Sequence, residues 1–232
     1  MSASPPSVPA RSAARSLGPI WLLVALALVL GVTVGIVVAF VSGRSSSRPA
    51  ALAPAPTRPA ATWAAGKRRA PDFRLHDQAG QLISLSSLHG RPVLLTFIDP
   101  VCRNLCPLEA KVLNGVEQRL PVSQRPAIVA VSVNPWADAR TNLRVDARKW
   151  HLSRAWRWAL GREGELAPVW HQYAIGVRVL TRMIAGVRLR TVEHTEGSYL
   201  IDRAGYVRAL FLFPFTAADV ARTTRQVAAA PS

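Results

Sequence analysis

The stretch from Val93 to Pro107, VLLTFIDPVCRNLCP, limits the possible fold of this chain more than any other. It begins with an apolar run rich in β-branched residues, which is typical of a strand buried on both faces. The run ends at Asp99-Pro100, and the only two cysteines of the chain follow at positions 102 and 106. Pro107 opens a segment with apolar residues at helical spacing, and proline suits the first turn of a helix. The stretch therefore predicts a strand-to-helix junction that carries two sulfur atoms.

The segments after this junction predict strands and helices in alternation. A second apolar run at 127–133 follows a helix predicted at 107–120, so the two strands should be parallel and joined by a right-handed crossover. A third strand at 155–160 and an antiparallel hairpin at 198–213 extend the sheet. The other expected elements are a short hairpin within 73–85, a helix from Asp138 to Trp150, a helix at 165–173, a hairpin-like excursion at 176–191 and a closing helix at 216–227 with Thr216 as its N-cap. This plan predicts an α/β, thioredoxin-like fold, with a central mixed sheet flanked by helices.

The first 66 residues differ in composition from the rest of the chain. Residues 1–18 are rich in Ser, Pro and Ala and predict a disordered segment. Residues 19–41 carry no charge, and about 22 residues of helix span about 33 Å, so they predict a transmembrane anchor. A cleaved signal peptide is the alternative, but its apolar core is shorter, about 7–15 residues. Residues 42–66 are rich in Pro, Ala and Ser and predict a linker, which leaves residues 67–232 as one domain.

The formal charge of +16 raises the question of nucleic acid as a partner. The arginines are scattered singly among acidic residues and no block of Lys and Arg occurs, so we expect no binding to nucleic acid. A basic surface of this kind favours an acidic partner or anionic lipid head groups. Arginines flank residues 19–41 on both sides, so charge alone does not decide the orientation of the anchor.

The two cysteines are expected at the carboxyl end of the first buried strand, where open α/β sheets gather their reactive groups. Residues four apart lie on one face of a helical turn, and a helix N-terminus favours the thiolate. Two thiolates suit Cu(I), and an added imidazole gives a site that also holds Cu(II). A Cys-rich structural zinc site is excluded, because it needs four protein ligands and the chain has no third cysteine. A plain disulfide and a pair of buried thiols are the simpler alternatives.

His194 is the candidate for a third ligand among the five histidines. It lies in TVEHTEGSYLID, in a loop before a strand predicted next to the core. In a thioredoxin-like sheet that loop faces the cysteine loop. The metal site predicted from the residues therefore consists of Cys102, Cys106 and His194. The other histidines are expected to have ordinary surface or structural roles: His76, His89, His151 and His171.

Four segments together resemble the SCO (SenC) family of membrane-anchored, thioredoxin-like copper proteins of cytochrome oxidase assembly. They are TFIDPVCRNLCP, AIVAVSVNPWADARTNLRVDARKW, WRWALGREGELAPVWHQYAIGV and EHTEGSYLIDRAGYVRALF, in the right order between about residues 70 and 227. The specific elements are C-x-x-x-C-P, matched by Cys102, Cys106 and Pro107, and a distant histidine, matched by His194. The resemblance implies that these residues bind copper and that the domain lies outside the cytoplasm, on a single-pass anchor in the cell membrane.

The chain departs from the family pattern inside and before the cysteine motif. Arg103-Asn104 stands where the family usually has Pro-Asp, and Pro100-Val101 stands where a Thr/Arg-His-type pair is often found. Glu193 is compatible with the acidic residue that often precedes the histidine. Arg103 adds positive charge, so we expect it to lower the pKa of both thiols, to weaken cation binding and to favour redox chemistry.

Two functions from different classes follow. The first is a copper metallochaperone, not an enzyme, that binds one copper ion through Cys102, Cys106 and His194 and delivers it to a cytochrome oxidase subunit or another copper protein. The second is a membrane-anchored thiol–disulfide oxidoreductase, with Cys102 and Cys106 as a redox-active pair that reduces extracytoplasmic oxidase-assembly proteins. A dedicated thioredoxin-type reductant has C-x-x-C, so the longer spacing favours the first. A thiol peroxidase is disfavoured, because Asp99 and not Thr or Ser lies three residues before Cys102.

Overall fold

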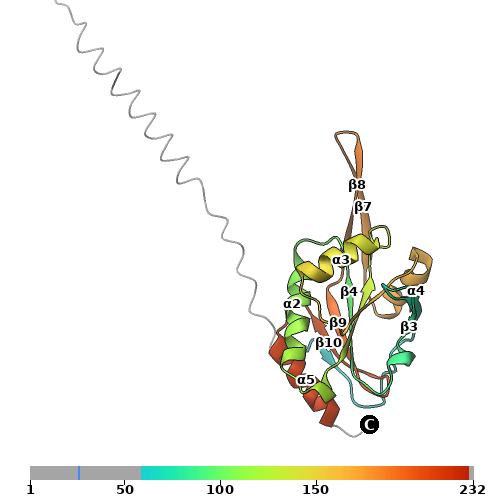
Figure 1. Ribbon diagram of the computed structural model, residues 1–232, viewed down its shortest axis with the longest axis vertical. Coiled ribbons are helices and arrows are strands. Elements are labelled where there is room, and N and C mark those ends of the chain that lie inside the picture. The colour runs from blue at the N-terminus through green and yellow to red at the C-terminus, as the bar shows by residue number, and fades with distance from the viewer. Residues whose placement is uncertain (1–25, 27–58, 230–232) are drawn as a thin grey trace, which may run out of the picture. The chain divides into compact units, whose positions relative to one another are not determined.

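The computed structural model describes Leu26 and residues 59–229 (Figure 1). The disordered segment predicted at 1–18 lies outside the described residues. So do the anchor predicted at 19–41, apart from Leu26, and residues 42–58 of the predicted linker. Within the part of the chain that is described, no helix has the length and apolar character needed to cross a bilayer.

One six-stranded sheet forms the frame of the domain, in the order β1-β10-β9-β4-β5-β6. β4 (Val93–Ile98), β5 (Ala127–Ser132) and β6 (Trp156–Ala159) are parallel. β9 (Gly197–Ile201) pairs antiparallel with β4 and with β10 (Val207–Leu212), and β1 (Ala61–Thr62) pairs with β10. Every residue of β4, β5 and β9 is buried, as expected of strands covered on both faces. The predicted mixed α/β sheet, with parallel strands first and an antiparallel hairpin last, is confirmed.

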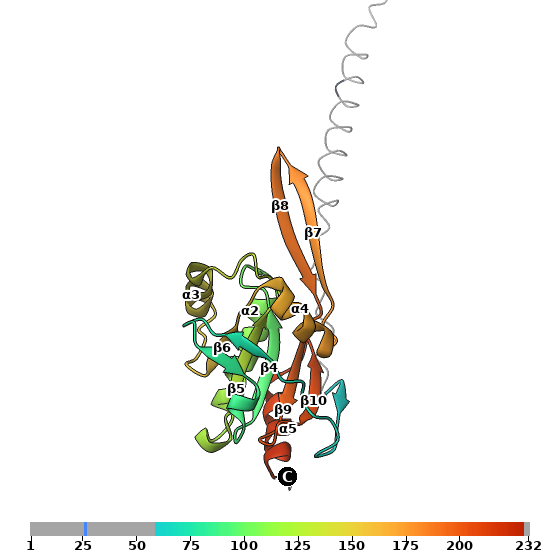
Figure 2. The ribbon, with the colours of Figure 1, turned by 90° about the vertical axis from the view of Figure 1, so that its right-hand side faces the viewer.

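Helices cover both faces of this sheet (Figures 1 and 2). Successive residues of β4 point to opposite faces. Leu94 belongs to a core that contains residues of α2 (Leu105–Gln118), α3 (Arg140–Lys149) and α5 (Ala217–Ala229). Leu95 belongs to a second core with residues of α4 (Glu163–Gln172) and of the short hairpin β2 (Arg74–His76) and β3 (Leu82–Ser84). Two 3₁₀ turns, η1 (Ser86–Leu88) and η2 (Val122–Gln124), lie in the connections.

Capping side chains fix the first residues of two helices. The Thr216 hydroxyl accepts a hydrogen bond from the Asp219 N–H at 3.1 Å, which confirms Thr216 as the N-cap of α5. The helix predicted from Pro107 begins two residues earlier, at Leu105, because Asn104 is its N-cap and accepts the Leu105 N–H at 2.9 Å. Cys106 therefore lies inside the first turn of α2 rather than before it.

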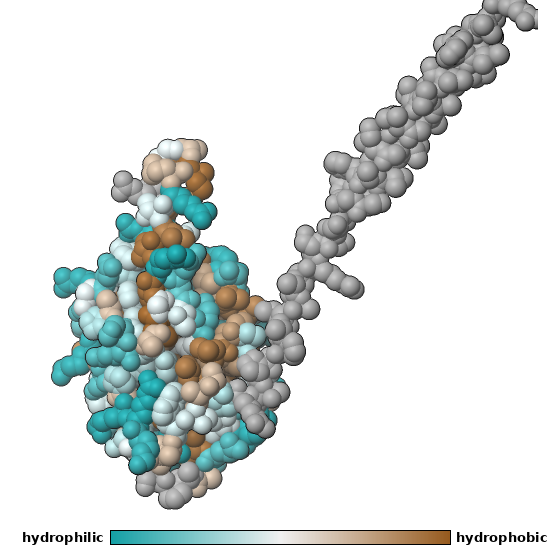
Figure 3. All heavy atoms as spheres, turned by 180° about the vertical axis from the view of Figure 1, so that it is seen from behind, coloured by the Kyte–Doolittle hydropathy of each residue, from teal (hydrophilic) through white to brown (hydrophobic). Residues whose placement is uncertain are grey.

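A long hairpin of β7 (Val177–Ile184) and β8 (Val187–His194) projects from the body of the domain (Figures 1 and 2). It confirms the predicted excursion and pairs in register from Val177 with His194 to Ile184 with Val187. Figure 3 shows apolar side chains along this hairpin, and four large ones are exposed: Met183, Ile184, Val187 and Leu189.

His194 is the last residue of β8, and its prediction in a loop is wrong. The hairpin is longer than expected because its pairing with β7 continues to Val177. The side chain of Glu193 is exposed and forms an ion pair with Arg178 on the neighbouring strand. A strand end is a more fixed position than a loop, so His194 is held by the ladder at the base of the hairpin.

Candidate metal centre

Cys102 and Cys106 lie in the connection between β4 and α2. The carboxylate of Asp99, directly after β4, accepts hydrogen bonds from Val101 N–H at 2.9 Å and from the Asn134 side-chain amide at 3.0 Å. Cys102 N–H donates to the Asp99 carbonyl at 3.1 Å. These bonds tie the turn to the ends of β4 and β5. They leave Cys102 half-buried just outside the helix and Cys106 fully buried in its first turn.

The sulfur of Cys102 is surrounded by hydrogen-bond donors at the N-terminus of α2. The thiol of Cys106 contributes most, and the backbone N–H groups of Cys106, Asn104 and Leu105 add to it. The Cys106 N–H lies 3.4 Å from this sulfur. A contact of 2.9 Å to Asn104 Oδ1 favours the thiol, and so does burial. The donors outweigh both and lower the pKa of Cys102 to about 5, so this cysteine is a thiolate at neutral pH.

Cys106 has the opposite protonation state. Its hydrogen bond to the Cys102 sulfur, its burial and the nearby charge of Glu196 raise the pKa of the Cys106 thiol far above its usual range. The prediction that Arg103 lowers the pKa of both thiols is therefore wrong for Cys106. At Cys102 hydrogen bonds account for the shift. Arg103 is 62% exposed, donates to the Cys102 carbonyl at 3.1 Å and lies 3.5 Å from the Asp146 carboxylate.

His194 points into the domain, and its side chain is 4% exposed. Its Nδ1 lies 3.1 Å from the carbonyl oxygen of Thr195, so an N–H at this position donates to the backbone and leaves a lone pair on Nε2. Nε2 lies 4.0 Å from Cys106 Sγ and 3.3 Å from Glu196 Oε1. The fold thus brings Cys106 and His194 together from positions 88 residues apart.

Two acidic residues at the site were not predicted from the sequence. Atoms of Cys106, His194 and Glu196 all lie within 4.8 Å of one another, a group that does not include Cys102. Glu109 is fully buried, and its Oε1 accepts hydrogen bonds from Thr96 at 2.7 Å and Ser198 at 2.6 Å. Burial, followed by the influence of Glu109, raises the pKa of Glu196. The sequence did hold one sign that Glu109 has a special role, because an acidic residue three positions after Cys106 interrupts an apolar helix face.

The remaining histidines are exposed, in agreement with the expected surface positions of His76 and His89. His171 lies in α4 as predicted, but its side chain is exposed, so a structural role for it is not supported. Among the described residues, the Cys106–His194–Glu196 group is the cluster of His, Cys, Asp and Glu that is close enough to share one metal ion.

The sulfur of Cys102 opens into a cavity of about 370 Å³. The β4–α2 connection forms one wall, and residues 190–194 of β8 together with Glu196 form the other. The cavity gives a ligand access to Cys102, His194 and Glu196, whereas the fully buried Cys106 does not line it. Cys102 is therefore the more accessible of the two cysteines.

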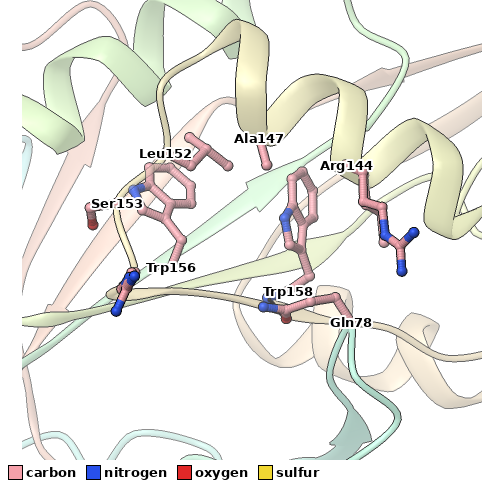
Figure 4. A pocket seen from close by; sticks show the side chains of 9 residues that line it. Gln78, Arg144, Ala147, Leu152, Ser153, Trp156 and Trp158 are labelled. Carbon is pink, nitrogen blue, oxygen red and sulfur yellow. Dashed lines mark hydrogen bonds between the residues drawn. The ribbon is translucent and has the colours of Figure 1, made fainter.

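A second cavity, of about 350 Å³, lies between α3 and β6 (Figure 4). The rings of Trp156 and Trp158 rise from the strand in this view, with Ala147 above Trp158 and Arg144 to its right. Its lining contains no Cys, His, Asp or Glu. This cavity therefore offers none of the side chains that most often bind a metal ion or transfer a proton.

A family model described as SCO1/SenC matches residues 62–229 of the chain. A search of curated proteins found no match.

Solved structures of the same fold include Bradyrhizobium japonicum ScoI with copper bound, which has 22% identity and a TM-score of 0.57. That match covers 68% of this chain and 99% of the other. Yeast Sco1 with copper bound has 16% identity and a TM-score of 0.62, over 71% of this chain and 91% of the other. BsSco, whose structure is described for a disulfide switch in a cytochrome c oxidase assembly protein, has 20% identity and a TM-score of 0.54, over 71% and 95%.

Proposed function

Because this chain belongs to the SCO1/SenC family, we propose that it is a copper metallochaperone that binds one copper ion through Cys102, Cys106 and His194. It delivers the ion to a cytochrome oxidase subunit or another copper protein. The observation that carries the proposal is the approach of Cys106 Sγ to His194 Nε2, at 4.0 Å, from distant parts of the chain. Relatives of the same fold have been solved with copper bound.

The chemistry of the donor set fits copper. Thiolate sulfur suits Cu(I), and imidazole nitrogen accommodates both oxidation states. Cys102 is already a thiolate at neutral pH and lines the cavity, so an incoming ion or a recipient can reach it without a change in the fold. Cys106 loses its proton when the metal binds, because a coordinated thiol is deprotonated despite a high pKa in the free site.

The fixed orientation of His194 supports its role as the third ligand. The Thr195 carbonyl holds the Nδ1 side of the ring, and the lone pair of Nε2 is directed toward Cys106. Delivery then proceeds by ligand exchange, in which ligands of the recipient replace those of this site one at a time. The order of release follows accessibility, with the half-buried Cys102 leaving before the buried Cys106.

The test is copper binding by the purified, reduced domain. Wild type should bind one copper at sub-micromolar affinity, and His194→Ala should lose Cu(II) affinity and change the Cu(II) absorption. His171→Ala is the matched control, because His171 is exposed on α4 and belongs to no cluster of potential metal ligands among the described residues. Absence of copper binding by wild type, or identical binding by His194→Ala, refutes the proposal.

We further propose that residues 19–41 anchor the protein in the cell membrane and that the domain lies on the extracytoplasmic side. The uncharged 23-residue run and the Pro-rich segment after it support the anchor. A membrane-impermeant maleimide should label Cys102 in intact cells or spheroplasts. Labelling that occurs only after lysis contradicts this orientation.

The thiolate of Cys102 also supports a second candidate, a thiol–disulfide oxidoreductase. Cys102 would attack a disulfide of an oxidase-assembly protein, and one thiolate of that protein would leave as a mixed disulfide forms. Cys106 would then attack Cys102 and release the second thiolate, so that two electrons pass to the partner and a Cys102–Cys106 disulfide remains, for re-reduction by another dithiol. The raised pKa of Cys106 slows that second step, which favours the chaperone. A dithiol potential near about −270 mV together with reductase activity would favour the reductant.

A further inference from the structure

Glu196 has an unusual position for an acidic side chain in a site that binds a soft metal ion. It lies between β8 and β9, where its carbonyl accepts the Phe213 N–H at 3.1 Å and so ties its backbone to the sheet. The preceding Thr195 is held on the other side, because its N–H donates to the Gly176 carbonyl at 3.0 Å. The Glu196 side chain is 15% exposed and is directed toward His194.

The separations in this group match those of ligands around one ion. Cu(II) prefers square-planar or tetragonal sites, and soft sulfur ligands favour tetrahedral ones. With metal–nitrogen and metal–oxygen bonds of about 2.0 Å and a metal–sulfur bond of about 2.3 Å, neighbouring ligands across this range lie about 2.8–3.3 Å apart for nitrogen and oxygen, and about 3.0–3.5 Å apart for nitrogen and sulfur. Glu196 Oε1 is 3.3 Å from His194 Nε2, at the tetrahedral end of the range. Cys106 Sγ is 4.0 Å from the same nitrogen, so binding of an ion needs a shift of about 0.5–1 Å.

The Glu196 carboxyl also contacts a second buried acid, Glu109. Glu196 Oε2 and Glu109 Oε2 are both buried and, within the part of the chain that the structure describes, neither has a conventional hydrogen-bond partner. Glu109 Oε1 is held by the hydroxyls of Thr96 and Ser198, which fixes the carboxyl of Glu109 beside that of Glu196. Glu109 therefore orients the Glu196 carboxylate, and Oε1 of Glu196 remains directed at His194.

We infer that Glu196 is an oxygen ligand of the copper ion in its Cu(II) state, next to the sulfur and nitrogen ligands of the proposed function, on which this inference rests. A carboxylate oxygen is a hard, anionic donor that stabilises Cu(II) much more than Cu(I). The site then holds both oxidation states of copper, with the carboxylate bound in one and released in the other. Glu109 acts as a positioning residue for that ligand.

The chain offers a matched control for this inference. Glu193 is three residues away and carries the same carboxylate on the wall of the same cavity, but it is 53% exposed, paired with Arg178, and outside the group formed by Cys106, His194 and Glu196. Substitution of Glu193 by Gln therefore makes the same change of side chain as substitution of Glu196 by Gln, without removing a member of the Cys106–His194–Glu196 group.

The test compares wild type, Glu196→Gln, Glu196→Asp and Glu193→Gln, each loaded with Cu(II) alone or Cu(I) alone. Electron paramagnetic resonance reports the Cu(II) ligands, and chelator competition reports both affinities. We expect Glu196→Gln to change the Cu(II) spectrum and to weaken Cu(II) at least tenfold, with Cu(I) within threefold. A tenfold loss selective for Cu(II) raises the Cu(II)/Cu(I) potential by about 59 mV. Glu196→Asp should keep an oxygen-ligated spectrum, and Glu193→Gln should match wild type.

Two results overturn the inference, and they are distinguishable. If wild type binds copper and Glu196→Gln has the same spectrum and Cu(II) affinity, Glu196 is not a ligand and the proposed function stands. If wild type binds no copper, the proposed function fails and the inference fails with it. The apo variants are compared by far-UV circular dichroism and thermal unfolding, and a loss of affinity in Glu196→Gln with an intact fold and an altered spectrum supports ligation.

Discussion

The asymmetry of the two cysteines leads to a quantitative prediction for the reduced apo domain. With a pKa of about 5, Cys102 is about 90% thiolate at pH 6, whereas an ordinary cysteine with a pKa of about 8.5 is about 0.3% thiolate. The lower pKa also makes the thiolate about 40-fold less nucleophilic. Alkylation of Cys102 by iodoacetamide at pH 6 should therefore be about sevenfold faster than that of a model thiol. Above pH 9 it should be slower than the model thiol.

The shape of the pH profile is the more stringent measurement. The rate of Cys102 alkylation, followed by mass spectrometry of peptides, should rise with a midpoint near pH 5 and be flat from about pH 6 upward. Cys106, buried and protonated, should remain unlabelled on the same timescale. A midpoint above pH 8, or equal labelling of both cysteines, refutes the assignment of the thiolate to Cys102.

Two substitutions separate the causes of the low pKa. Cys106→Ala removes the donor that contributes most to the Cys102 thiolate, so the midpoint should move upward. Cys106→Ser keeps a hydroxyl that can donate to the same sulfur, so its midpoint should stay closer to that of wild type. Arg103→Ala should leave the midpoint within about half a pH unit, because hydrogen bonds and not the guanidinium account for the shift.

Three further predictions concern stability. Glu109→Ala leaves two buried hydroxyls without their acceptor and should destabilise the domain in urea by about 2–6 kcal/mol; a loss below about 1 kcal/mol contradicts the network. Burial raises the pKa of Asp138 to about 7, above its unfolded value, so this residue's stabilising contribution is complete at low pH and is lost as the pH rises through 4 to 7. Between pH 5 and 8 wild type should lose on the order of 3 kcal/mol more than Asp138→Asn, and parallel stability curves refute this. Thr216→Ala should cost about 1 kcal/mol through loss of the α5 cap, with Thr216→Ser near wild type; an equal loss in both variants argues against capping.

The parts of the fold that could be predicted from the sequence are those set by burial and periodicity. β4 and β5 are continuous apolar runs because both faces are covered, and α2 keeps its buried positions at helical spacing. The start of α2 was not predicted because it depends on one hydrogen bond, which the Leu105 N–H donates to the side-chain oxygen of Asn104. The extent of β8 was missed because both faces of the projecting hairpin meet solvent over most of its length, so no alternation marks its end.

The site was predicted only as far as residue type and chain order allow. Two cysteines at a strand-to-helix junction predict a site with sulfur ligands, and a histidine before a core strand is a candidate for a further ligand. Glu196 could not be predicted, because its place in the site depends on the direction of a single side chain between two strands. Glu109 could not be predicted either, because hydroxyl groups on β4 and β9 set its orientation. The sequence predicts that Arg103 lowers the pKa of the thiols because it is adjacent to Cys102 in the chain. In the structure its side chain lies instead against the Cys102 carbonyl and the Asp146 carboxylate.

The 88 positions that separate Cys106 from His194 make a bound ion a long-range cross-link in the chain. For a permanent bridge, loop closure of this length removes about 4.6 kcal/mol of conformational entropy from the unfolded chain, whereas a Cys102–Cys106 disulfide spans four positions and removes about 2 kcal/mol. The copper ion carried by the proposed chaperone therefore also links the base of the projecting hairpin to the first turn of α2. Transfer of the ion to a recipient removes this cross-link, so the unfolding temperature of the chaperone reports how much copper it has delivered.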